Sequence, residues 1–468
     1  MTKQTKIVAT ISDLKSDIPF LKELVEEGVN VFRMNTAHQT PKDTLAAIKR
    51  MRIAAPKAPI IVDTKGPEVR TTALKDEPII VKKGDKVIFA GNKNKETSIK
   101  TIYLNYNGFH KDVPKGASIL YDDGEIGFKV VDKKPTHLVC QVQNNGTIKG
   151  KKSINVPSVD MKLPSLTEKD KMYVEFSAKN NVDFIAHSFI RNRADIMAVQ
   201  KILDKFKAKT KIIAKIENQE GVDNIDEILD CCAGIMVARG DLAIEIPAQK
   251  VPSIQKKIIK KCIKKRKIVI TATQMLHTMI ENPRPTRAEI SDIANAVYDG
   301  TDCLMLSGET AYGKYPVEAV KVMTRVAKEI EVEKPAFKST AVNTIKDEIP
   351  NFLAQAAVKA SLEMPIKAIL TDTLTGRTAK YLSAFRGQSR IYAMCYDEKT
   401  MRELAFSYGV YADKVKLKEK YIFKKKLKEL VKRKILKLTD NVIVISGSFG
   451  PSQGASKMEI STVKNRLK

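Results

Sequence analysis

Acidic side chains stand at the ends of two neighbouring apolar runs in this 468-residue sequence. Glu217 directly follows the run KIIAKI, and Asp241 comes shortly after the run GIMVA, so the two carboxylates end consecutive predicted strands. Hard divalent cations such as Mg²⁺ prefer oxygen ligands and keep positions open for phosphate and water. The pair is therefore a candidate Mg²⁺ site, and two separate surface acids are the alternative.

A lysine and a glycine add to this pattern. Lys215 precedes Glu217 by two residues, which in an extended strand places both side chains on the same face. An ammonium beside a metal-binding carboxylate can neutralise a phosphoryl group in transfer, whereas a plain salt bridge to Glu217 is the competing interpretation. Gly240, just before Asp241, lets backbone N–H groups approach an anion such as a substrate carboxylate.

Alternating strand-like and helix-like segments must position these residues. KIVATI, VNVFRM and PIIVD form an early set of three apolar runs, and DFIAHSF, KIIAKI, GIMVA, KIVITA and DCLML form a later set of five. Eight parallel strand–helix units close a (β/α)₈ TIM barrel, whose sites lie at the C-terminal ends of the strands. Ser165 and Glu168 are spaced for a capping box at the start of the first helix of the later set.

Two segments depart from this alternation. From about residue 71 to 155, short alternating strands are separated by Gly, Asp and Asn turns, which predicts an inserted all-β domain. After about residue 338 a further α/β pattern predicts a separate C-terminal domain. The expected division is therefore 1–70 with 156–337 for the barrel, 71–155 for the insert and 338–468 for the C-terminal domain.

The strong positive charge favours nucleic acid as a partner only at first sight. Lys and Arg number 82 against 54 acids, a formal net charge of +28. The excess peaks at 414–437, where apolar residues are spaced as the buried stripe of a helix with a solvated lysine face, namely Phe423, Leu427, Leu430, Val431 and Ile435. Because Trp is absent and no recognition motif occurs, we expect no nucleic-acid partner.

The remaining composition excludes several other classes of protein. The six cysteines form no CxxC pair, which is typical of a reducing cytoplasm rather than of a disulfide framework. We find no apolar leader and no apolar stretch of ~18 residues, so we expect neither secretion nor a membrane span. The segment from Gly308 to Lys314 has P-loop spacing, but Tyr315 stands where the motif needs Ser or Thr.

Long motifs in the chain resemble the pyruvate kinase family from end to end. They include NVFRMNTAH, VDTKGPEVRT, IIAKIENQEG, GIMVARGDLAIEIP and TATQMLHTMIENPRPTRAEISDIANAVYDGTDCLMLSGET. The resemblance implies a TIM barrel with a β lid domain inserted after the third strand and a C-terminal regulatory domain. It also implies transfer of the phosphoryl group of phosphoenolpyruvate to ADP, the last step of glycolysis, by a cytoplasmic homotetramer.

The resemblance assigns roles at the barrel mouth by position. Glu217 and Asp241 match the Mg²⁺ ligands, and Lys215 matches the lysine that stabilises the phosphoryl group in flight. Arg33 is similar to the phosphate-contacting arginine. The N–H groups of Gly240 and Asp241 would hold the substrate carboxylate. Thr273 matches the residue that lies over the enolate carbon. Ser307 matches the serine of a proton relay.

Nucleotide and effector positions also follow from the resemblance. The positions on the nucleotide side are Arg70, His38, Lys152 and Asn35. In the C-terminal domain a hydroxyl-rich turn before a predicted helix suits a phosphate and resembles the family's effector loop, with the residues Thr373, Thr375, Gly376, Arg377 and Thr378. Ordinary N-capping by Thr373 or Thr375 is the alternative. A sugar phosphate or a nucleotide is the expected class of effector.

The resemblance implies a K⁺ site that departs from the family pattern. Asn35, Asp63 and the Thr64 carbonyl are present, but Ala37 stands where the family usually has a serine whose hydroxyl binds the ion. Glu68 is similar to the form found in K⁺-dependent members. We therefore expect K⁺ activation that needs more ion than usual.

Two other hypotheses compete with an active pyruvate kinase. One is a catalytically weak relative kept for regulation or nucleic-acid binding, and the other is a different phosphoenolpyruvate-using barrel enzyme. The retained Lys215, Glu217 and Asp241 argue against the first. The β insert and the NPRPT segment beginning at Asn282 argue against the second.

Overall fold

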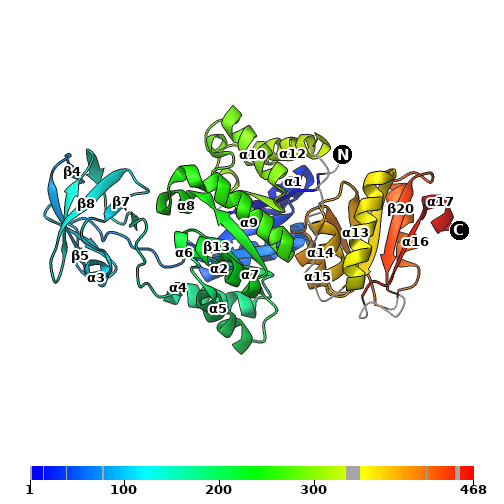
Figure 1. Cartoon of the computed structure of the whole chain (residues 1–468), viewed down its shortest axis with the longest axis horizontal. Coiled ribbons are helices and arrows are strands. Elements are labelled where there is room, and N and C mark those ends of the chain that lie inside the picture. Colours follow the sequence, from blue (N-terminus) through cyan, green and yellow to red (C-terminus); the bar gives the residue numbers. More distant parts are fainter. Residues whose placement is uncertain are drawn as a thin grey trace.

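Three parts follow one another along the molecule in Figure 1, which is a computed structural model. It describes residues 3–13, 15–37, 39–75, 78–333, 348–417, 419–447 and 454–468. The inserted β segment lies at one end, the barrel in the middle, and the C-terminal α/β segment at the other end. The predicted fold class, a TIM barrel with a β insert and a C-terminal α/β domain, is confirmed.

Among the described residues, eight parallel strands close the barrel in the order β1-β16-β15-β14-β13-β12-β3-β2. Their bounds are β1 (Lys6–Ile11), β2 (Val31–Asn35), β3 (Ile60–Asp63), β12 (Phe184–His187), β13 (Lys211–Ile216), β14 (Gly234–Ala238), β15 (Ile268–Ala272) and β16 (Cys303–Leu306). Both faces of these strands are buried, which explains their nearly continuous Val, Ile and Leu runs. Phe406 of the C-terminal part packs against Phe184 inside the barrel's N-terminal end, with ring centroids 4.6 Å apart.

Amphipathic helices cover the outside of the barrel and bury their apolar faces in one core with the strands. They are α1 (Ile18–Glu27), α2 (Pro41–Ala54), α4 (Glu168–Lys179), α5 (Arg193–Lys205), α6 (Gln219–Asp223), α7 (Ile225–Cys231), α8 (Arg239–Glu245), α9 (Val251–Lys265), α10 (Arg287–Asp299), α11 (Gly308–Ala311) and α12 (Pro316–Glu333). Within the described ranges, no helix is long and apolar enough to cross a membrane.

The capping box of α4 differs from the predicted one. The reciprocal pair is Thr167 with Asp170, not Ser165 with Glu168. Thr167 Oγ1 accepts from the Asp170 N–H at 3.1 Å, and the Asp170 carboxylate accepts from the Thr167 N–H at 3.0 Å. Asp170 also accepts from the Gly66 N–H at 3.1 Å, so a contact with the loop after β3 fixes where the helix begins. Asp170 stands where the usual capping-box pattern has Glu or Gln, so the pattern alone pointed to Ser165 and Glu168.

The insert between β3 and α4 has a core of its own. A six-stranded sheet runs β11-β7-β8-β9-β5-β6, and β4 (Ile79–Val81) pairs with β10 (Gly146–Ile148). The sheet strands are β5 (Lys86–Gly91), β6 (Thr101–Leu104), β7 (Ser118–Tyr121), β8 (Ile126–Lys133), β9 (Leu138–Val142) and β11 (Ile154–Asn155). Phe89 packs edge-on against Phe128 and also contacts Phe109 of α3 (Phe109–Asp112).

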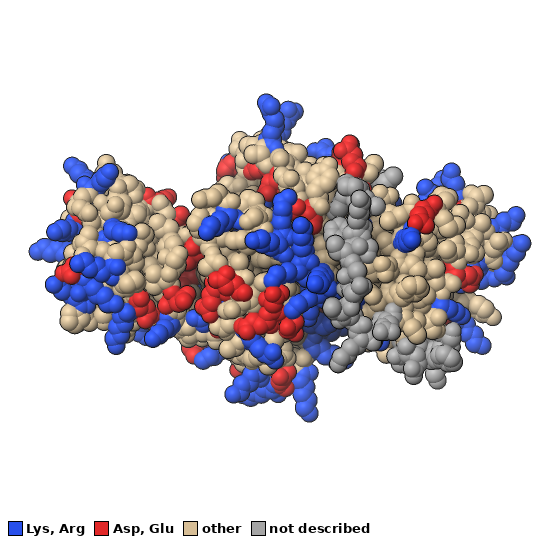
Figure 2. All heavy atoms as spheres, in the orientation of Figure 1, with Lys and Arg blue, Asp and Glu red and all other residues tan. Residues whose placement is uncertain are grey.

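The C-terminal part is a sheet of order β19-β18-β17-β20-β21 with helices on both faces. Its elements are α13 (Glu348–Glu363), β17 (Ile366–Thr373), α14 (Arg377–Ala384), β18 (Arg390–Cys395), α15 (Glu398–Leu404), β19 (Val410–Lys414), α16 (Ile422–Lys432), β20 (Asn441–Ser446), β21 (Lys457–Thr462) and α17 (Val463–Leu467). Leu427 and Leu430 of α16 are fully buried, as the predicted stripe requires. Lys and Arg side chains spread over all three parts on the face shown in Figure 2.

A buried aspartate ties the C-terminal part to the barrel. Asp183, just before β12, is fully buried and accepts from Arg402 Nε of α15 at 2.8 Å, Arg52 Nη2 at 2.6 Å and the Ile60 N–H at 2.9 Å. We expect Asp183→Ala to lower the free energy of unfolding by about 2 kcal/mol, because it leaves buried donors without a partner. Urea unfolding followed by circular dichroism measures this. Asp204→Ala, which removes an exposed acid on α5, is the control, and equal midpoints for the two variants would contradict the expectation.

Candidate active site

Eight of the predicted site residues line a cavity of about 230 Å³ at the C-terminal ends of the barrel strands, whereas Gly240, Thr273 and Ser307 do not line it. Its lining includes the predicted residues Arg33, Asn35, Asp63, Thr64, Arg70, Lys215, Glu217 and Asp241. Arg70 lies where the chain enters the insert. The others come from the ends of β2, β3 and β13 and from the first turn of α8, so the barrel closure brings together side chains that are up to about two hundred positions apart in sequence.

Lys215 lies at the centre of this cluster. Its Nζ is 3.0 Å from Glu217 Oε1 and 3.3 Å from Asp63 Oδ1, and it donates to Ser188 Oγ at 2.6 Å. Arg33 Nε lies 2.6 Å from Asp63 Oδ2, so Asp63 holds both cations at the cavity. The salt bridge between Lys215 and Glu217, which was the alternative interpretation of this lysine, is present. Together with Asp63 it holds the Lys215 ammonium at the cavity, where an ammonium can also act on a bound phosphoryl group.

The carboxylates of the cluster differ in their electrostatics. Burial raises the pKa of Glu217 to about 7, although Lys215 opposes the shift, and burial also raises the pKa of Asp241. Burial acts on Asp63 in the same sense, but Arg33 and Lys215 outweigh it and lower the pKa of Asp63. The negative charge of Asp241 adds to the rise in the pKa of Glu217. The carboxylates of the buried Glu217 and the half-buried Asp241 line one cavity, and such a donor set fits a hard divalent cation.

Gly240 and Thr273 lie beside each other at the start of α8. The Gly240 N–H donates to Thr273 Oγ1 at 2.7 Å, and this hydroxyl donates to the Ala272 carbonyl at 2.7 Å. Thr273 has a φ of 70°, which is rare for a β-branched residue and typical of functional sites. Arg239 Nη2 donates to the Thr273 carbonyl at 2.7 Å and supports this backbone. A substrate carboxylate that binds the Gly240 N–H must therefore replace the Thr273 hydroxyl.

Ser307 is joined to neighbouring strand ends through its backbone. Its N–H donates to Glu309 Oε2 at 2.7 Å, and Glu309 Oε1 accepts from the Leu276 N–H at 3.0 Å. The sequence places Glu309 and Ser188 at predicted strand ends but assigns a role to neither. Sequence reasoning missed Thr10, whose hydroxyl accepts from Arg33 Nη1 at 2.9 Å. A polar residue near the C-terminal end of an apolar run was the available signal for Thr10.

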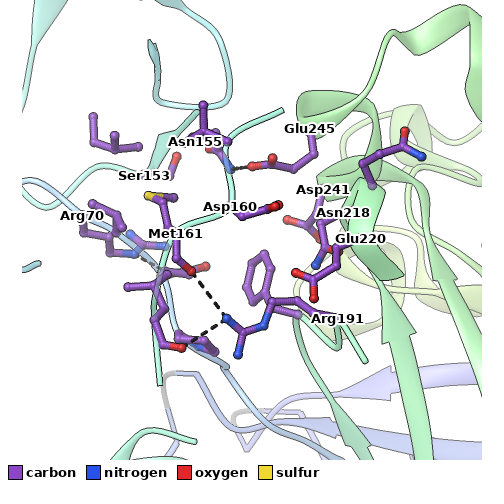
Figure 3. Close-up of a pocket in the computed structure, with 18 of the residues that line it drawn as sticks. Arg70, Ser153, Asn155, Asp160, Met161, Arg191, Asn218, Glu220, Asp241 and Glu245 are labelled. Carbon is purple, nitrogen blue, oxygen red and sulfur yellow. Dashed lines mark hydrogen bonds and ion pairs between the residues drawn. The ribbon is translucent and has the colours of Figure 1, made fainter. Parts of the chain in front are cut away.

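A larger cavity of about 400 Å³ lies between the insert and the barrel. Figure 3 shows Arg70 and Ser153 on the insert side and Asn218, Asp241 and Glu245 on the barrel side. Arg70 and Lys152, which are predicted to contact the nucleotide, both line this cavity from the side of the insert. Arg70 Nε contacts Glu68 Oε2 at 2.6 Å, and Lys152 Nζ contacts Asp122 Oδ2 at 2.6 Å. Asn35 lines the smaller cavity, and His38 lies outside the described residues.

The groups expected at a K⁺ site lie close together. Asn35 Oδ1 accepts from the Ala37 N–H at 3.2 Å, and the Thr64 carbonyl accepts from Ser188 Oγ at 2.7 Å. Ala37 supplies no side-chain oxygen. Lys169 Nζ donates to the Ala37 carbonyl at 2.7 Å, and burial together with the nearby Lys65 lowers the pKa of Lys169. Sequence reasoning missed this lysine, because its contact joins α4 to the loop after β2.

The predicted effector turn lies in the C-terminal part, away from the barrel mouth. The Gly376 N–H donates to Thr373 Oγ1 at 2.8 Å, and Gly376 with a φ of 80° is the residue before α14. Neither threonine caps the helix as the alternative required. The residues of the turn that line a small cavity there are Thr373, Thr375, Arg377 and Thr378.

A closed parallel barrel with charged residues gathered at the C-terminal ends of its strands defines a TIM-barrel enzyme. The model of the pyruvate kinase barrel domain matches residues 2–320, and that of the pyruvate kinase alpha/beta domain matches residues 351–461. The pyruvate kinase of Borreliella burgdorferi is 49% identical over 482 residues, covering 100% of this chain and 99% of that protein. The pyruvate kinase of Bacillus licheniformis is 40% identical, covering 98% and 80%, and that of Clostridium perfringens is 43% identical, covering 88% and 89%.

The chain belongs to the pyruvate kinase family. Its function is that of a pyruvate kinase, a phosphotransferase that moves the phosphoryl group of phosphoenolpyruvate to ADP and gives pyruvate and ATP.

Proposed function

We propose that phosphoryl transfer takes place at the Lys215 cluster. The observation that carries this proposal is the position of the Lys215 ammonium, held between Glu217 and Asp63 with Arg33 beside it. These two cations neutralise charge on the phosphoryl group as it leaves the enolate oxygen and meets the ADP phosphate. The test is pyruvate formation from phosphoenolpyruvate and ADP with and without Mg²⁺, which we expect to need all three.

Glu217 and Asp241 would hold Mg²⁺, which supplies charge neutralisation and orients the transferring phosphate. Their place in one cavity and their raised pKa values support this assignment. The N–H groups of Gly240 and Asp241 bind the substrate carboxylate once the Thr273 hydroxyl has turned away. Thr273 then covers the enolate carbon, and Ser307 belongs to the path that delivers the proton.

ADP binds in the cavity between insert and barrel. Arg70 and Lys152 contact its phosphates, since both line this cavity, while Arg70 and Asn35 also line the smaller one that contains Lys215. His38 is proposed as a further phosphate contact from its match to the family motif alone. The insert thereby acts as a lid over the nucleotide, in keeping with domain limits at 71 and 155.

A K⁺ ion near Asn35, Asp63 and the Thr64 carbonyl would activate the enzyme. We expect Ala37→Ser to lower the K⁺ concentration for half-activation several-fold, because a hydroxyl replaces a water that substitutes for it only imperfectly. Titration of K⁺ against a large organic cation at fixed ionic strength measures the change.

Ala37→Gly is the matched control, since it alters the same position without adding an oxygen. A half-activation concentration that is the same in the parent, Ala37→Ser and Ala37→Gly would contradict this site. Full activity of the parent without K⁺ would instead show that a lysine supplies the positive charge in place of the ion. Lys169 contacts the carbonyl of Ala37 and is the candidate.

The family resemblance also supports a regulated, cytoplasmic homotetramer that acts in glycolysis. The turn Thr373–Thr378 would bind the phosphate of a sugar-phosphate or nucleotide effector, supported by its lining of a small cavity. This site belongs to the C-terminal effector domain, with 338–468 as its proposed limits. Light scattering with and without such ligands measures the assembly.

A further inference from the structure

A cavity of about 490 Å³ lies at the junction of the barrel and the C-terminal part. From the barrel, Lys211 and Lys267 line it near the N-terminal ends of β13 and β15. From the C-terminal part, Lys380 of α14 and Ser407 line it. Lys211 begins the same strand that ends at Lys215 and Glu217, so this cavity lies at the opposite end of the barrel from the active site.

The lining of this junction cavity carries an excess of positive charge. Its cationic residues are Lys209, Lys211, Arg266, Lys267, Lys380 and Arg386. Its acidic residues are Asp302 and Glu403. Each acid is already paired with a cation, since Arg386 Nη2 lies 3.0 Å from Asp302 and Lys211 contacts Glu403. The ammonium groups of Lys267 and Lys380 form no ion pair with either acid of the lining among the described residues.

Lys380 is the cation that the protein compensates least. It is half-buried, and no described residue accepts a hydrogen bond or forms an ion pair with its ammonium. Burial, with the repulsion of Lys211 and Lys267, lowers the pKa of Lys380 to about 8, although the attraction of Glu403 opposes the shift. A half-buried ammonium that forms no direct ion pair is costly, and an anion bound beside it lowers that cost.

Further donors surround the same space. Lys267 Nζ donates to the Cys232 carbonyl at 2.7 Å, and an ammonium has three N–H groups, so it keeps donors for a ligand. The buried Ser407 hydroxyl has no partner among the described residues. Phe184 and Ile212 contribute apolar wall. The volume is sufficient for a small phosphorylated molecule.

We propose that the junction cavity binds a small phosphate-bearing molecule with at least two negative charges, held chiefly by Lys380 and Lys267. This site is separate from the turn at Thr373–Thr378, because the two cavities share no lining residue. It goes beyond phosphoryl transfer and does not depend on the assignments at the barrel mouth.

Calorimetric titration of the full chain with inorganic pyrophosphate, without Mg²⁺ or substrates and at fixed ionic strength, tests the proposal. We expect Lys380→Met to weaken one binding event at least tenfold and Lys380→Arg to retain it. Lys428→Met removes an exposed lysine of α16 and is the matched control, which should bind like the parent. Arg377→Met, at the effector turn, should also keep the event.

Thermal melting gives a second readout. Without pyrophosphate, Lys380→Met should melt no lower than the parent, because it removes a half-buried charge. With pyrophosphate, the parent and Lys380→Arg should gain more stability than Lys380→Met. Lys380→Gln replaces Lys380→Met if the latter does not fold. Equal pyrophosphate affinity in the parent, Lys380→Met and Lys380→Gln would overturn the proposal. Loss of pyrophosphate binding in Arg377→Met instead, or no binding to the parent at millimolar concentration, would also overturn it.

Discussion

Lys215→Met should lower kcat by about 10²- to 10³-fold and leave the fold and the binding of phosphoenolpyruvate largely unchanged. The ammonium lies 3.0 Å from Glu217 and 3.3 Å from Asp63, so its position is fixed before substrate arrives. A preorganised charge that acts on the transferring group stabilises the transition state more than the ground state. Steady-state kinetics with separate values of kcat and of KM for phosphoenolpyruvate measure the effect.

The control for this variant is Lys201→Met, which removes an exposed lysine of α5. Circular dichroism should be the same for both variants, since Asp63 keeps its ion pair with Arg33 when Lys215 is lost. Near-normal turnover of a folded Lys215→Met would refute the role of this lysine. A change confined to KM would reduce the role to substrate binding.

Glu217→Ala and Asp241→Ala should each raise the Mg²⁺ concentration for half-activation by about 100-fold or more. Each removes one of the two carboxylates that line the cavity together, the buried Glu217 or the half-buried Asp241. Mg²⁺ bound through only one or two carboxylates then has no protein oxygen to replace the lost one. Titration of Mg²⁺ at saturating phosphoenolpyruvate and ADP measures the requirement.

Asp223→Ala, an exposed acid of α6 near the same strand end, is the matched control and should behave like the parent. Metal dependence that is unchanged in both Glu217→Ala and Asp241→Ala would place the cation elsewhere. A comparable loss in Asp223→Ala would show that the general acidity of the barrel mouth, rather than the pair, attracts the ion.

The barrel could be predicted from the sequence because its signals are local. Buried parallel strands appear as short apolar runs, and the chemistry-bearing residues follow those runs directly, as Glu217 follows KIIAKI. Barrel closure then brings Arg33, Asp63 and Lys215 together without any further information from the sequence. The β insert was predictable for the same reason, since its alternation differs from that of the barrel.

Contacts between neighbouring elements could not be predicted in this way. Ser188 binds Lys215 across adjacent strands, and Lys169 reaches the carbonyl of Ala37 from α4. The spacing of residues within one element carries no information about such partners. The capping box of α4 was misassigned for a related reason. Asp170, which forms the box with Thr167, also accepts from the Gly66 N–H, and this contact with another element is not visible in the local sequence.

Phosphoryl transfer at the Lys215 cluster is tested most directly by single-turnover transfer from phosphoenolpyruvate to ADP in the parent and in Lys215→Met. Rapid quenching follows ATP and pyruvate at saturating Mg²⁺, so that product release does not mask the chemical step. We expect equal amounts of the two products in the parent and a rate of transfer at least 100-fold lower in the variant. Equal transfer rates in the two proteins would contradict the account.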